Sequence, residues 1–221
     1  MDPDPVDGST DEGSRTRAGY RRSAGSRRGE ARRRELLTRV ADDLATNGLV
    51  DFSLRRAARA AGTTHKVLLY YFDGAEDLLE QAILELRRKR IGNVLAATGV
   101  TDHPRLADRV RAMWSVLREA ESGLRVLDQA IGLAMYDSGR YAELGRGASE
   151  QYLPTLVALC PDHWSDQRKV EVAEMILAVL RGFLVDWLTS GDTAGVAAGF
   201  EALARALERE EAADDHPASA R

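Results

Sequence analysis

The stretch SLRRAARAAGTTHKVLLYYF, residues 53–72, begins as an amphipathic helix and breaks at Gly62. Small and polar residues follow the glycine, and the stretch ends in Tyr70, Tyr71 and Phe72. Leu68 and Phe72 lie four residues apart, so they share the inward face of a second short helix. Two short helices joined by a tight turn that contains a glycine form a helix-turn-helix.

The polar residues after the turn have the chemistry of a DNA-reading helix. In a helix-turn-helix the second helix lies in the major groove, and its N-terminal residues meet base edges. Lys66 can donate to guanine acceptors, and Val67 can touch a thymine methyl group. The phenols of Tyr70 and Tyr71 can donate to phosphate oxygens. Ser53, at the start of the first short helix, can bring its hydroxyl and nearby N–H groups to another phosphate.

Helix pairs with a glycine turn also occur in all-α proteins that bind no DNA, so the motif alone is a moderate signal. The charge distribution strengthens it. Residues 1–14 carry five acids and no base, whereas residues 15–34 carry nine arginines and one acid. A basic segment beside an acidic body favours a polyanionic partner. The alternative is a solvated, disordered arm, which is the commoner reading of such a charge run.

Helical patterning continues along the rest of the chain. Apolar residues at three- and four-residue spacing predict a first helix that stops near Gly48, and Asp73 with Glu76 reads as a capping box for a fourth helix. A break over 98–104 precedes further helices, the longest from about Asp166 to Ser190. No long segment alternates with the period of two that a strand requires. The sequence therefore predicts an all-α protein.

The composition is that of an ordinary soluble chain, with 44% hydrophobic and 30% charged residues. No run approaches the roughly 18 apolar residues of a membrane span, and the first residues lack the apolar core of a signal peptide. Cys160 is the single cysteine. These features predict a cytoplasmic protein with no membrane association, no disulfide and no cysteine-based metal site.

A resemblance to a known family adds to this reading. The segments RRELLTRVADDLATNG and FSLRRAARAAGTTHKVLLYYFDGAEDLLEQAI resemble the DNA-binding region of TetR/AcrR-type bacterial regulators. The resemblance is specific over about residues 30–86. The segment LRGFLVDWLTSGD, residues 180–192, is similar to the dimerisation region of that family.

The resemblance implies an all-α homodimer with an N-terminal helix-turn-helix three-helix DNA-binding domain and a C-terminal helical ligand-binding and dimerisation domain. We predict a disordered basic arm over 1–28, the DNA-binding domain over 29–75, the second domain over 76–210 and a disordered tail over 211–221. The predicted DNA contacts combine the arm, the first helix and the motif: Arg27, Arg28, Arg32, Arg33, Ser53, Arg55, Thr64, His65, Lys66, Val67, Tyr70 and Tyr71.

Two positions depart from the family pattern. Leu69 stands where the family usually has an aromatic residue, and Ala75 stands where a lysine usually anchors phosphate. Both changes weaken the grip on the DNA backbone. Our hypothesis is that the arginine arm compensates by reaching phosphates or a minor groove.

The second half is rich in large apolar side chains. At helical spacing such side chains more often form core than a pocket, and the pattern leaves that open. If a pocket exists, it is mostly apolar and favours a hydrophobic effector. Polar groups available to orient a ligand are Arg118, Gln129, Tyr136 and Tyr152. The predicted ligand-binding residues are Met113, Trp114, Leu117, Leu127, Ile131, Met135, Tyr152, Leu156, Met175, Val179, Phe183 and Trp187.

The long helix near the C-terminus is apolar over more than one stripe, as expected if one face lines the interior and another meets a partner. Twofold symmetry would repeat a two-helix patch and build a four-helix interface. The predicted interface residues are Leu180, Leu184, Phe200, Leu203 and Leu207.

The predicted function is therefore a ligand-responsive transcriptional regulator. It is a repressor that binds palindromic double-stranded operator DNA as a homodimer and is released by a hydrophobic small molecule. The alternative is a DNA-binding interaction protein without an effector, whose acidic half recruits another protein. No catalytic or cofactor motif is present, so we predict neither an enzyme nor a cofactor. GRGAS, residues 145–149, reads as a connection between helices, and Cys160 reads more readily as a buried apolar residue than as a redox sensor.

Overall fold

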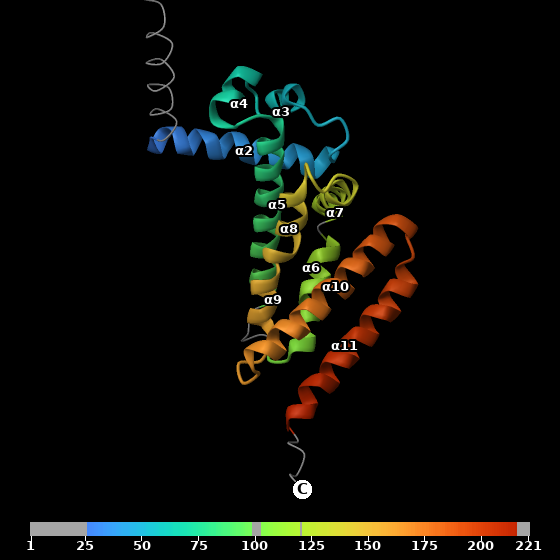
Figure 1. Ribbon diagram of the computed structural model, residues 1–221. Coiled ribbons are helices and arrows are strands. Elements are labelled where there is room, and N and C mark those ends of the chain that lie inside the picture. Colours follow the sequence, from blue (N-terminus) through green and yellow to red (C-terminus); the bar gives the residue numbers. More distant parts are fainter. Residues whose placement is uncertain (1–25, 99–102, 120, 216–221) are drawn as a thin grey trace, which may run out of the picture. The chain divides into compact units, whose positions relative to one another are not determined.

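The computed structural model of the chain describes residues 26–98, 103–119 and 121–215. Every regular element in these ranges is an α-helix (Figure 1), so the described chain is all-α, as predicted. The helices are α2 (Arg27–Asn47), α3 (Leu54–Ala60), α4 (His65–Tyr71), α5 (Ala75–Ala97), α6 (Leu106–Glu119), α7 (Glu121–Tyr136), α8 (Ala142–Glu150), α9 (Leu153–Leu159), α10 (Asp166–Ser190) and α11 (Thr193–Asp215).

The described residues form two compact units. The first contains residues 26–43 and 51–82, and the second contains residues 44–50 and 83–215. The boundary therefore falls inside α5, seven residues later than predicted. The reason is that Leu78, Leu79 and Ala82, at the start of α5, are buried apolar residues of the first unit. The predicted arm over 1–28 lies almost wholly outside the described residues, and α2 already begins at Arg27.

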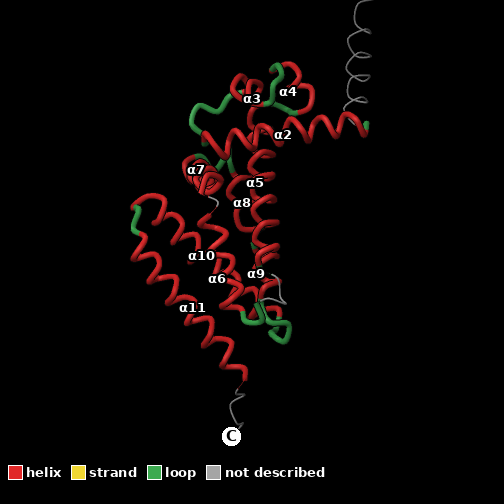
Figure 2. The backbone as a smooth tube through the Cα atoms, turned by 180° about the vertical axis from the view of Figure 1, so that it is seen from behind, coloured by secondary structure: helices red, strands yellow, loops and turns green. Residues whose placement is uncertain are grey.

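The first unit is held together by small and branched apolar side chains. Leu36 and Val40 of α2, Ala57 of α3 and Leu68 of α4 are fully buried. Fully burying a leucine contributes about 1.5–3 kcal/mol, so these contacts fix α3 and α4 on α2. A short turn joins α3 to α4 (Figure 2).

The start of α5 corrects the predicted capping box. The backbone N–H of Asp73 donates to Oδ2 of Asp77 at 2.8 Å, whereas the sequence pattern pointed to Glu76. Gly74 adopts φ +120°, and its carbonyl accepts from the N–H of Leu78. A φ of this kind favours glycine because a Cβ would clash with the backbone. The cap is therefore displaced by one residue.

The core of the second unit is built by α6, α9, α10 and α11. Trp114 of α6 stacks on Phe200 of α11, with 5.0 Å between the ring centroids, and meets the edge of Phe183 of α10 at 6.2 Å. Gly199 lets α11 approach α10 closely, because a Cβ at this position would stand 2.7 Å from the Phe183 ring. Large apolar side chains at helical spacing could form either core or a pocket. For these three aromatic residues, core is the correct interpretation.

The glycine-containing segment 145–149 is not a connection, since it lies inside α8. Glycine lowers helix propensity by about 1 kcal/mol relative to alanine, which explains why the pattern pointed to a loop. Packing outweighs that cost. A Cβ on Gly145 would stand 3.1 Å from Cβ of Ala134, and one on Gly147 would stand 2.9 Å from Nη1 of Arg87. Both glycines admit a close neighbour.

The C-terminal helix also runs further than predicted. α11 ends at Asp215, whereas a disordered tail was expected from 211. The side chain of Glu211 accepts from the N–H of Leu106 at 2.7 Å, and Nη2 of Arg168 donates to the carbonyl of Glu210 at 2.7 Å. These contacts tie the last turns of α11 to α6 and α10. Residues 216–221 lie outside the described part of the chain.

In the ranges that the structure describes, no helix combines the length and the apolar character that crossing a lipid bilayer would demand.

Candidate functional site

The turn between α3 and α4 is built as a helix-turn-helix requires. Gly62 adopts φ +62°, its N–H donates to the carbonyl of Arg59, and the N–H of Thr63 donates to that of Ala58. The hydroxyl of Ser53 accepts from the N–H of Arg56 and caps α3. The hydroxyl of Thr64 accepts from the N–H of Val67 and caps α4. Each cap stabilises its helix by about 1 kcal/mol.

Helix α4 has one buried and one exposed face. Leu68 is fully buried and Phe72, just after the helix, is 2% exposed. His65, Lys66 and Leu69 are exposed, whereas Val67, Tyr70 and Tyr71 are partly exposed. The two tyrosine rings meet edge to face, with 4.7 Å between their centroids. This is the division of faces that the sequence predicted.

The arginines assigned to DNA contact divide into two groups. Arg27, Arg28 and Arg55 are exposed. Arg32 pairs with Glu35 at 2.6 Å on the surface, and this hydrogen bond is the main cause of the lowered pKa of the Glu35 carboxyl.

Arg33 is partly exposed and makes contacts within the first unit. Its Nε donates to the carbonyl of Tyr71 at 3.3 Å, and its Nη2 donates to the side chain of Gln81. The guanidinium also lies over the Phe72 ring, 5.0 Å from the centroid. Arg33 therefore ties α2 to the end of α4 and to α5. The other arginines of the predicted arm, at positions 15–22, lie outside the described residues.

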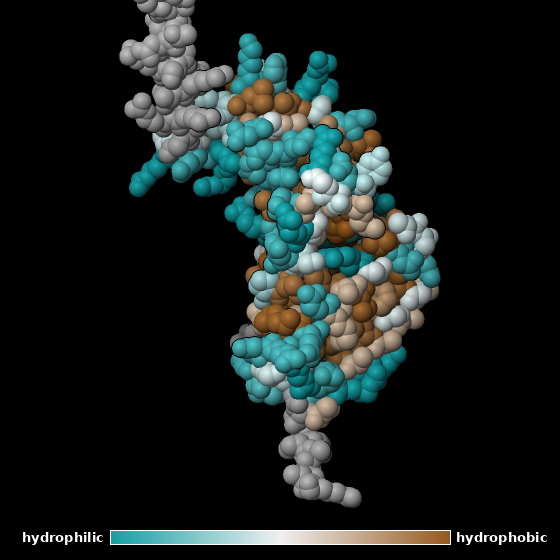
Figure 3. Space-filling view, viewed as in Figure 1, coloured by the Kyte–Doolittle hydropathy of each residue, from teal (hydrophilic) through white to brown (hydrophobic). Residues whose placement is uncertain are grey.

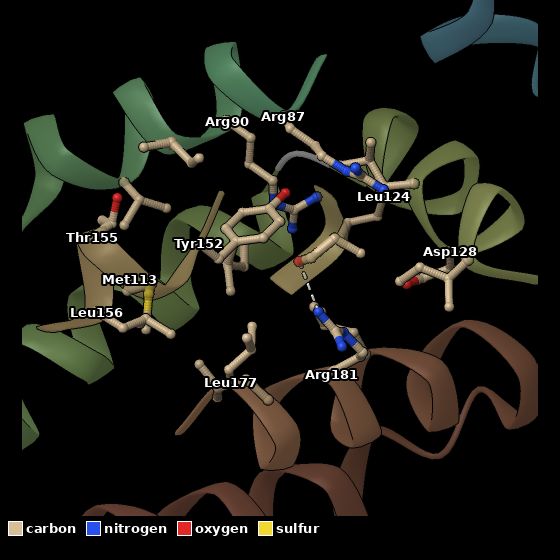
Figure 4. Close-up of a pocket in the computed structure, with 18 residues that line it drawn as sticks. Arg87, Arg90, Met113, Leu124, Asp128, Tyr152, Thr155, Leu156, Leu177 and Arg181 are labelled. Atoms are coloured by element: carbon tan, nitrogen blue, oxygen red, sulfur yellow. Dashed lines mark hydrogen bonds between the residues drawn. The ribbon is translucent and has the colours of Figure 1, made fainter. Parts of the chain in front are cut away.

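The second unit contains a cavity among α5, α6, α7, α8, α9 and α10 (Figure 4). It holds about 710 Å³ of empty space when its open mouth is included. Its lining is Arg87, Arg90, Ile91, Val94, Met113, Leu117, Leu124, Leu127, Asp128, Ile131, Ala148, Tyr152, Thr155, Leu156, Leu177, Leu180, Arg181 and Leu184.

Half of the predicted ligand-binding residues line this cavity. They are Met113, Leu117, Leu127, Ile131, Tyr152 and Leu156. The other half do not. Met135 is 83% exposed and Met175 is 40% exposed, Trp114 and Phe183 are packed in the aromatic core, Val179 packs against that core, and Trp187 lines a separate hollow with Ser115 and Arg118. The spacing placed them on the same helices but could not tell which side of each helix meets the cavity.

Three of the four polar groups proposed to orient a ligand also lie elsewhere. Tyr136 is 90% exposed. Gln129 is exposed and accepts from the N–H of Leu49 at 2.9 Å. Arg118 lies over the Trp187 ring, 5.8 Å from its centroid. Tyr152 lines the cavity.

The predicted dimer-interface residues are buried within the single chain. Leu180 and Leu184 line the cavity, and Phe200, Leu203 and Leu207 belong to the core between α6, α10 and α11. None of the five is more than 8% exposed. The prediction is wrong for these residues, because the stripe of α10 and α11 that looked suited to a partner faces the interior.

Sequence reasoning missed the charged lining of the cavity. Arg87 and Arg90 extend from α5, Asp128 comes from α7 and Arg181 comes from α10 (Figure 4). The run RRKR, residues 87–90, reads as a solvated segment. A signal was nonetheless available, since Arg87 lies four residues after the buried Ile83 and so continues the apolar face of α5.

Only some nitrogens of the cavity arginines have hydrogen-bond partners. Nη2 of Arg87 donates to the carbonyl of Leu144 at 2.8 Å, and Nη2 of Arg181 donates to that of Ala148 at 2.9 Å. Within the described residues, the buried atoms Nη1 of Arg87, Nη2 of Arg90 and Oδ2 of Asp128 have no hydrogen-bond partner.

The cavity shifts the pKa of its ionisable groups. Burial lowers the pKa of the guanidinium groups of Arg87 and Arg90, which remain charged at neutral pH because arginine starts above 12. Burial raises the pKa of the Asp128 carboxyl, although Arg90 and Arg181 oppose the shift. Burial also raises the pKa of Tyr152, again against the effect of the arginines.

Cys160 behaves as a buried apolar residue. It is 2% exposed, and burial raises the pKa of its thiol to about 11. A reactive cysteine needs the opposite shift, because the thiolate is the nucleophile. Among the described residues, no three His, Cys, Asp or Glu side chains come together as a metal site would require.

No protein-family profile matches the sequence, and no curated protein matches it. Several solved structures share its fold. A protein from Rhodococcus sp. assigned to the TetR family of transcriptional regulators is 16% identical, with a TM-score of 0.63, over 80% of this chain and 96% of that one. A protein from Streptomyces coelicolor A3(2) assigned as a transcriptional regulator is 20% identical, with a TM-score of 0.61, over 79% and 96%.

The fatty acid degradation regulator FadR from Bacillus halodurans is 13% identical, with a TM-score of 0.56, over 79% of this chain and 93% of that one. At these identities the shared property is the fold. The described chain has the fold of TetR-family transcriptional regulators.

Proposed function

We propose that this chain is a TetR/AcrR-type transcriptional regulator that binds palindromic operator DNA as a homodimer and is released by a small molecule in the cavity. The observation that carries the proposal is the build of α4. Its inner side is fixed by the buried Leu68 and Phe72, while His65 and Lys66 are exposed at its N-terminal end. A recognition helix needs this arrangement, because its first turn must reach base edges.

The remaining contacts follow from the same unit. Lys66 and His65 meet base edges, and Val67 meets a thymine methyl group. Tyr70, Tyr71, Ser53 and Arg55 lie where they can donate to phosphates, together with Arg27 and Arg28 at the start of α2. Arg33 supports this surface by linking α2 to the end of α4, and Thr64 supports it by capping α4.

A homodimer is supported by exposed apolar residues on α10. Val170, Met175 and Val185 are 48%, 40% and 45% exposed. In Figure 3 hydrophobic residues gather on the face over α10 and α11. A patch of this kind marks an interaction site. Pairing of such residues by twofold symmetry would give a dimer with two recognition helices, as a palindromic site with half-sites one DNA turn, roughly 34–36 Å, apart requires.

The cavity favours the effector-responsive regulator over the interaction protein without an effector. A ligand that binds better to a dimer unfit for the operator shifts the population toward that form and releases the DNA. The FadR neighbour is by its name a regulator of fatty acid degradation, which fits an apolar effector.

The DNA-binding claim is tested by selecting duplexes from a random library with the full chain and measuring their retention on a gel. We expect a palindrome to emerge. Replacing Lys66 by Ala together with Tyr70→Phe should weaken binding at least roughly tenfold, because a base contact and a phosphate contact are lost together. Lys89→Ala, at an exposed lysine of α5, serves as the control. Unchanged retention by the double variant would contradict the proposal.

The arginine arm is tested by removing residues 1–25, which keeps Ser26 and its hydrogen bond to the N–H of Gly29 at the start of α2. If the arm compensates for Leu69 and Ala75, the truncation should lower affinity and flatten its dependence on salt, because fewer phosphates are neutralised. An unchanged salt slope would refute the hypothesis while leaving the role of α4 intact.

A further inference from the structure

Four charged side chains from three helices surround one end of an otherwise apolar cavity. Arg87 and Arg90 come from α5, Asp128 from α7 and Arg181 from α10. Figure 4 shows the ring of Tyr152 between the α5 arginines and Arg181. These charged side chains therefore line one cavity, although they come from separate stretches of the sequence.

These arginines are not placed for the fold alone. Arg87 is 1% exposed, yet its Nη1 has no partner, and Nη2 of the neighbouring Arg90 has none either among the described residues. Leaving a buried donor unsatisfied is costly, so such atoms in a folded protein need an explanation. A group that the cavity binds would supply the missing acceptors.

Arg109 shows how the same unit treats a structural arginine. It is 6% exposed, and its Nε, Nη1 and Nη2 donate to the carbonyls of His103, Leu159 and Pro104 at 2.7, 2.6 and 3.1 Å. Every nitrogen of its guanidinium is used. The chain can thus give every nitrogen of a buried guanidinium a partner, and at the cavity it does not.

The charges of the lining select an anion. Three guanidinium groups face one carboxylate, so the lining carries a net charge of +2 when all four groups are ionised. Arg90 and Arg181 act electrostatically on the Asp128 carboxyl, whose Oδ2 has no hydrogen-bond partner in the described chain. A cationic ligand would be repelled by the arginines, and a neutral oxygen acceptor would pair with the orphaned donors without balancing their charge.

We propose that the cavity binds an apolar carboxylate, whose two oxygens accept from Nη1 of Arg87 and Nη2 of Arg90 while its hydrocarbon body fills the rest. This rests on the proposed function and deepens it, since it names the chemical class of the effector. Two orphaned donors match the two oxygens of one carboxylate, and guanidinium groups bind carboxylates with strong charge-assisted hydrogen bonds.

The rest of the lining fits the hydrocarbon part. Val94, Met113, Leu117, Leu156 and Leu177 supply apolar side chains from α5, α6, α9 and α10. Asp128 sets a limit on the charge of the ligand, because a second negative charge would lie near its carboxylate. A monoanion with an aliphatic or aromatic body meets both requirements.

The test measures binding to the full chain without DNA, by calorimetry. The probes are decanoate, 4-phenylbutyrate and 2-naphthoate, each compared with its alcohol, and decyltrimethylammonium. We expect at least one carboxylate to bind, and to bind more tightly than its alcohol, and the cation not to bind. Failure of all three carboxylates, or equal binding of acid and alcohol, would overturn the proposal.

Two variants locate the charge contact. Arg90→Met keeps the apolar stem and should weaken the carboxylate roughly 10- to 100-fold while leaving its alcohol unchanged. Arg88→Met is the matched control, since the side chain of Arg88 is 71% exposed on the same helix. An unchanged carboxylate affinity in Arg90→Met, with the helical circular dichroism preserved, would also overturn the proposal.

The same experiment separates this inference from the proposed function. If the carboxylate binds as expected but does not alter retention of the selected operator, the ligand class stands and the effector role fails. If the chain retains its operator and no carboxylate binds, DNA regulation stands and the ligand class fails.

Discussion

The two units treat their inward arginines differently. In the first unit Arg33 and Arg56 each donate to a backbone carbonyl and to a side-chain oxygen. No buried side-chain nitrogen or oxygen in residues 26–43 and 51–82 lacks a hydrogen-bond partner. In the second unit Arg87 and Arg90 each keep a buried nitrogen unpaired at the cavity.

The difference distinguishes arginines that stabilise the fold from arginines whose donors remain available for binding. A guanidinium that donates to buried carbonyl oxygens contributes to stability, since removing it leaves those acceptors buried without partners. A guanidinium with an orphaned donor is a poor stabiliser but a ready binding group. The described first unit thus gives its buried polar side-chain atoms partners, whereas the second unit leaves two guanidinium nitrogens unpaired at the cavity.

The largest effect is expected from removing the saturated arginine of the second unit. Arg109→Met leaves three carbonyl oxygens without their donor and should lower the free energy of unfolding by about 3 kcal/mol. Arg90→Met should lower it by less than about 1 kcal/mol, because the donor it removes was unpaired. Urea unfolding followed by circular dichroism compares the two. Equal losses would break the distinction between the two kinds of arginine.

The next effect concerns Arg33, which was first expected to bind DNA. Arg33→Met removes the ties to Tyr71 and Gln81 and the contact with the Phe72 ring, and should destabilise the first unit by about 1–2 kcal/mol. The salt slope of DNA binding should stay the same, because the guanidinium faces the fold. Arg28→Met, at an exposed arginine of the same helix, should do the reverse. A lower salt slope in Arg33→Met would restore its role as a phosphate contact.

A smaller effect of opposite sign is expected at Asp128. Because burial raises its pKa, the folded chain holds this proton more tightly than the unfolded chain does. The wild type therefore loses stability as pH rises from the unfolded pKa, near 3.8, through the folded pKa. Asp128→Asn lacks this loss and should be more stable at pH 7 by about 1 kcal/mol or less.

The control for the Asp128 prediction is to compare the stability of the variant and the wild type at low pH. Below pH 3.8 the carboxyl is protonated in both states, so the variant and the wild type should converge in stability. A variant that is less stable than the wild type at pH 7 would show that Asp128 is needed to balance the arginines, and would weaken the contrast between the cavity and the saturated regions.

The smallest expected effect is on the rate at which Cys160 is alkylated. Cys160 follows Leu159, whose carbonyl accepts from Arg109, and its thiol has a pKa of about 11. Alkylation by iodoacetamide at pH 8 should therefore be much slower in the folded chain than in urea, because little thiolate is present and the sulfur is buried. Arg109→Met should speed the reaction by loosening this region. Fast alkylation of the folded wild type would contradict the burial.

Features set by neighbouring residues were predictable from the sequence. Ser53, Gly62 and Thr64 each act within four residues of their own position, so the turn and both caps of the helix-turn-helix could be read directly. The bounds of α10 were predicted as well, because Ser165 caps its start and Gly191 adopts φ +71° at its end. Half of the ligand-binding residues predicted from helical spacing likewise line the cavity.

Features set by distant residues could not be read in this way. Leu180 and Leu184 look the same in sequence whether they face a cavity or a partner, because α10 is apolar on more than one side. Arg87 and Arg90 read as part of a charged run, and only the carbonyl of Leu144, 57 residues away from Arg87, shows that this run turns inward. The chemistry of the cavity thus depends on contacts that no local pattern contains.

Gly147 affects where the guanidinium of Arg87 lies. A methyl group at this position would stand 2.9 Å from Nη1 of Arg87, so alanine there would displace a flexible guanidinium rather than unfold α8. Although Gly147 does not line the cavity, it governs where one of its charges sits. Among homologues, positions 87 and 147 should therefore change together, and a lineage that acquires a larger residue at 147 should have altered the ligand it recognises.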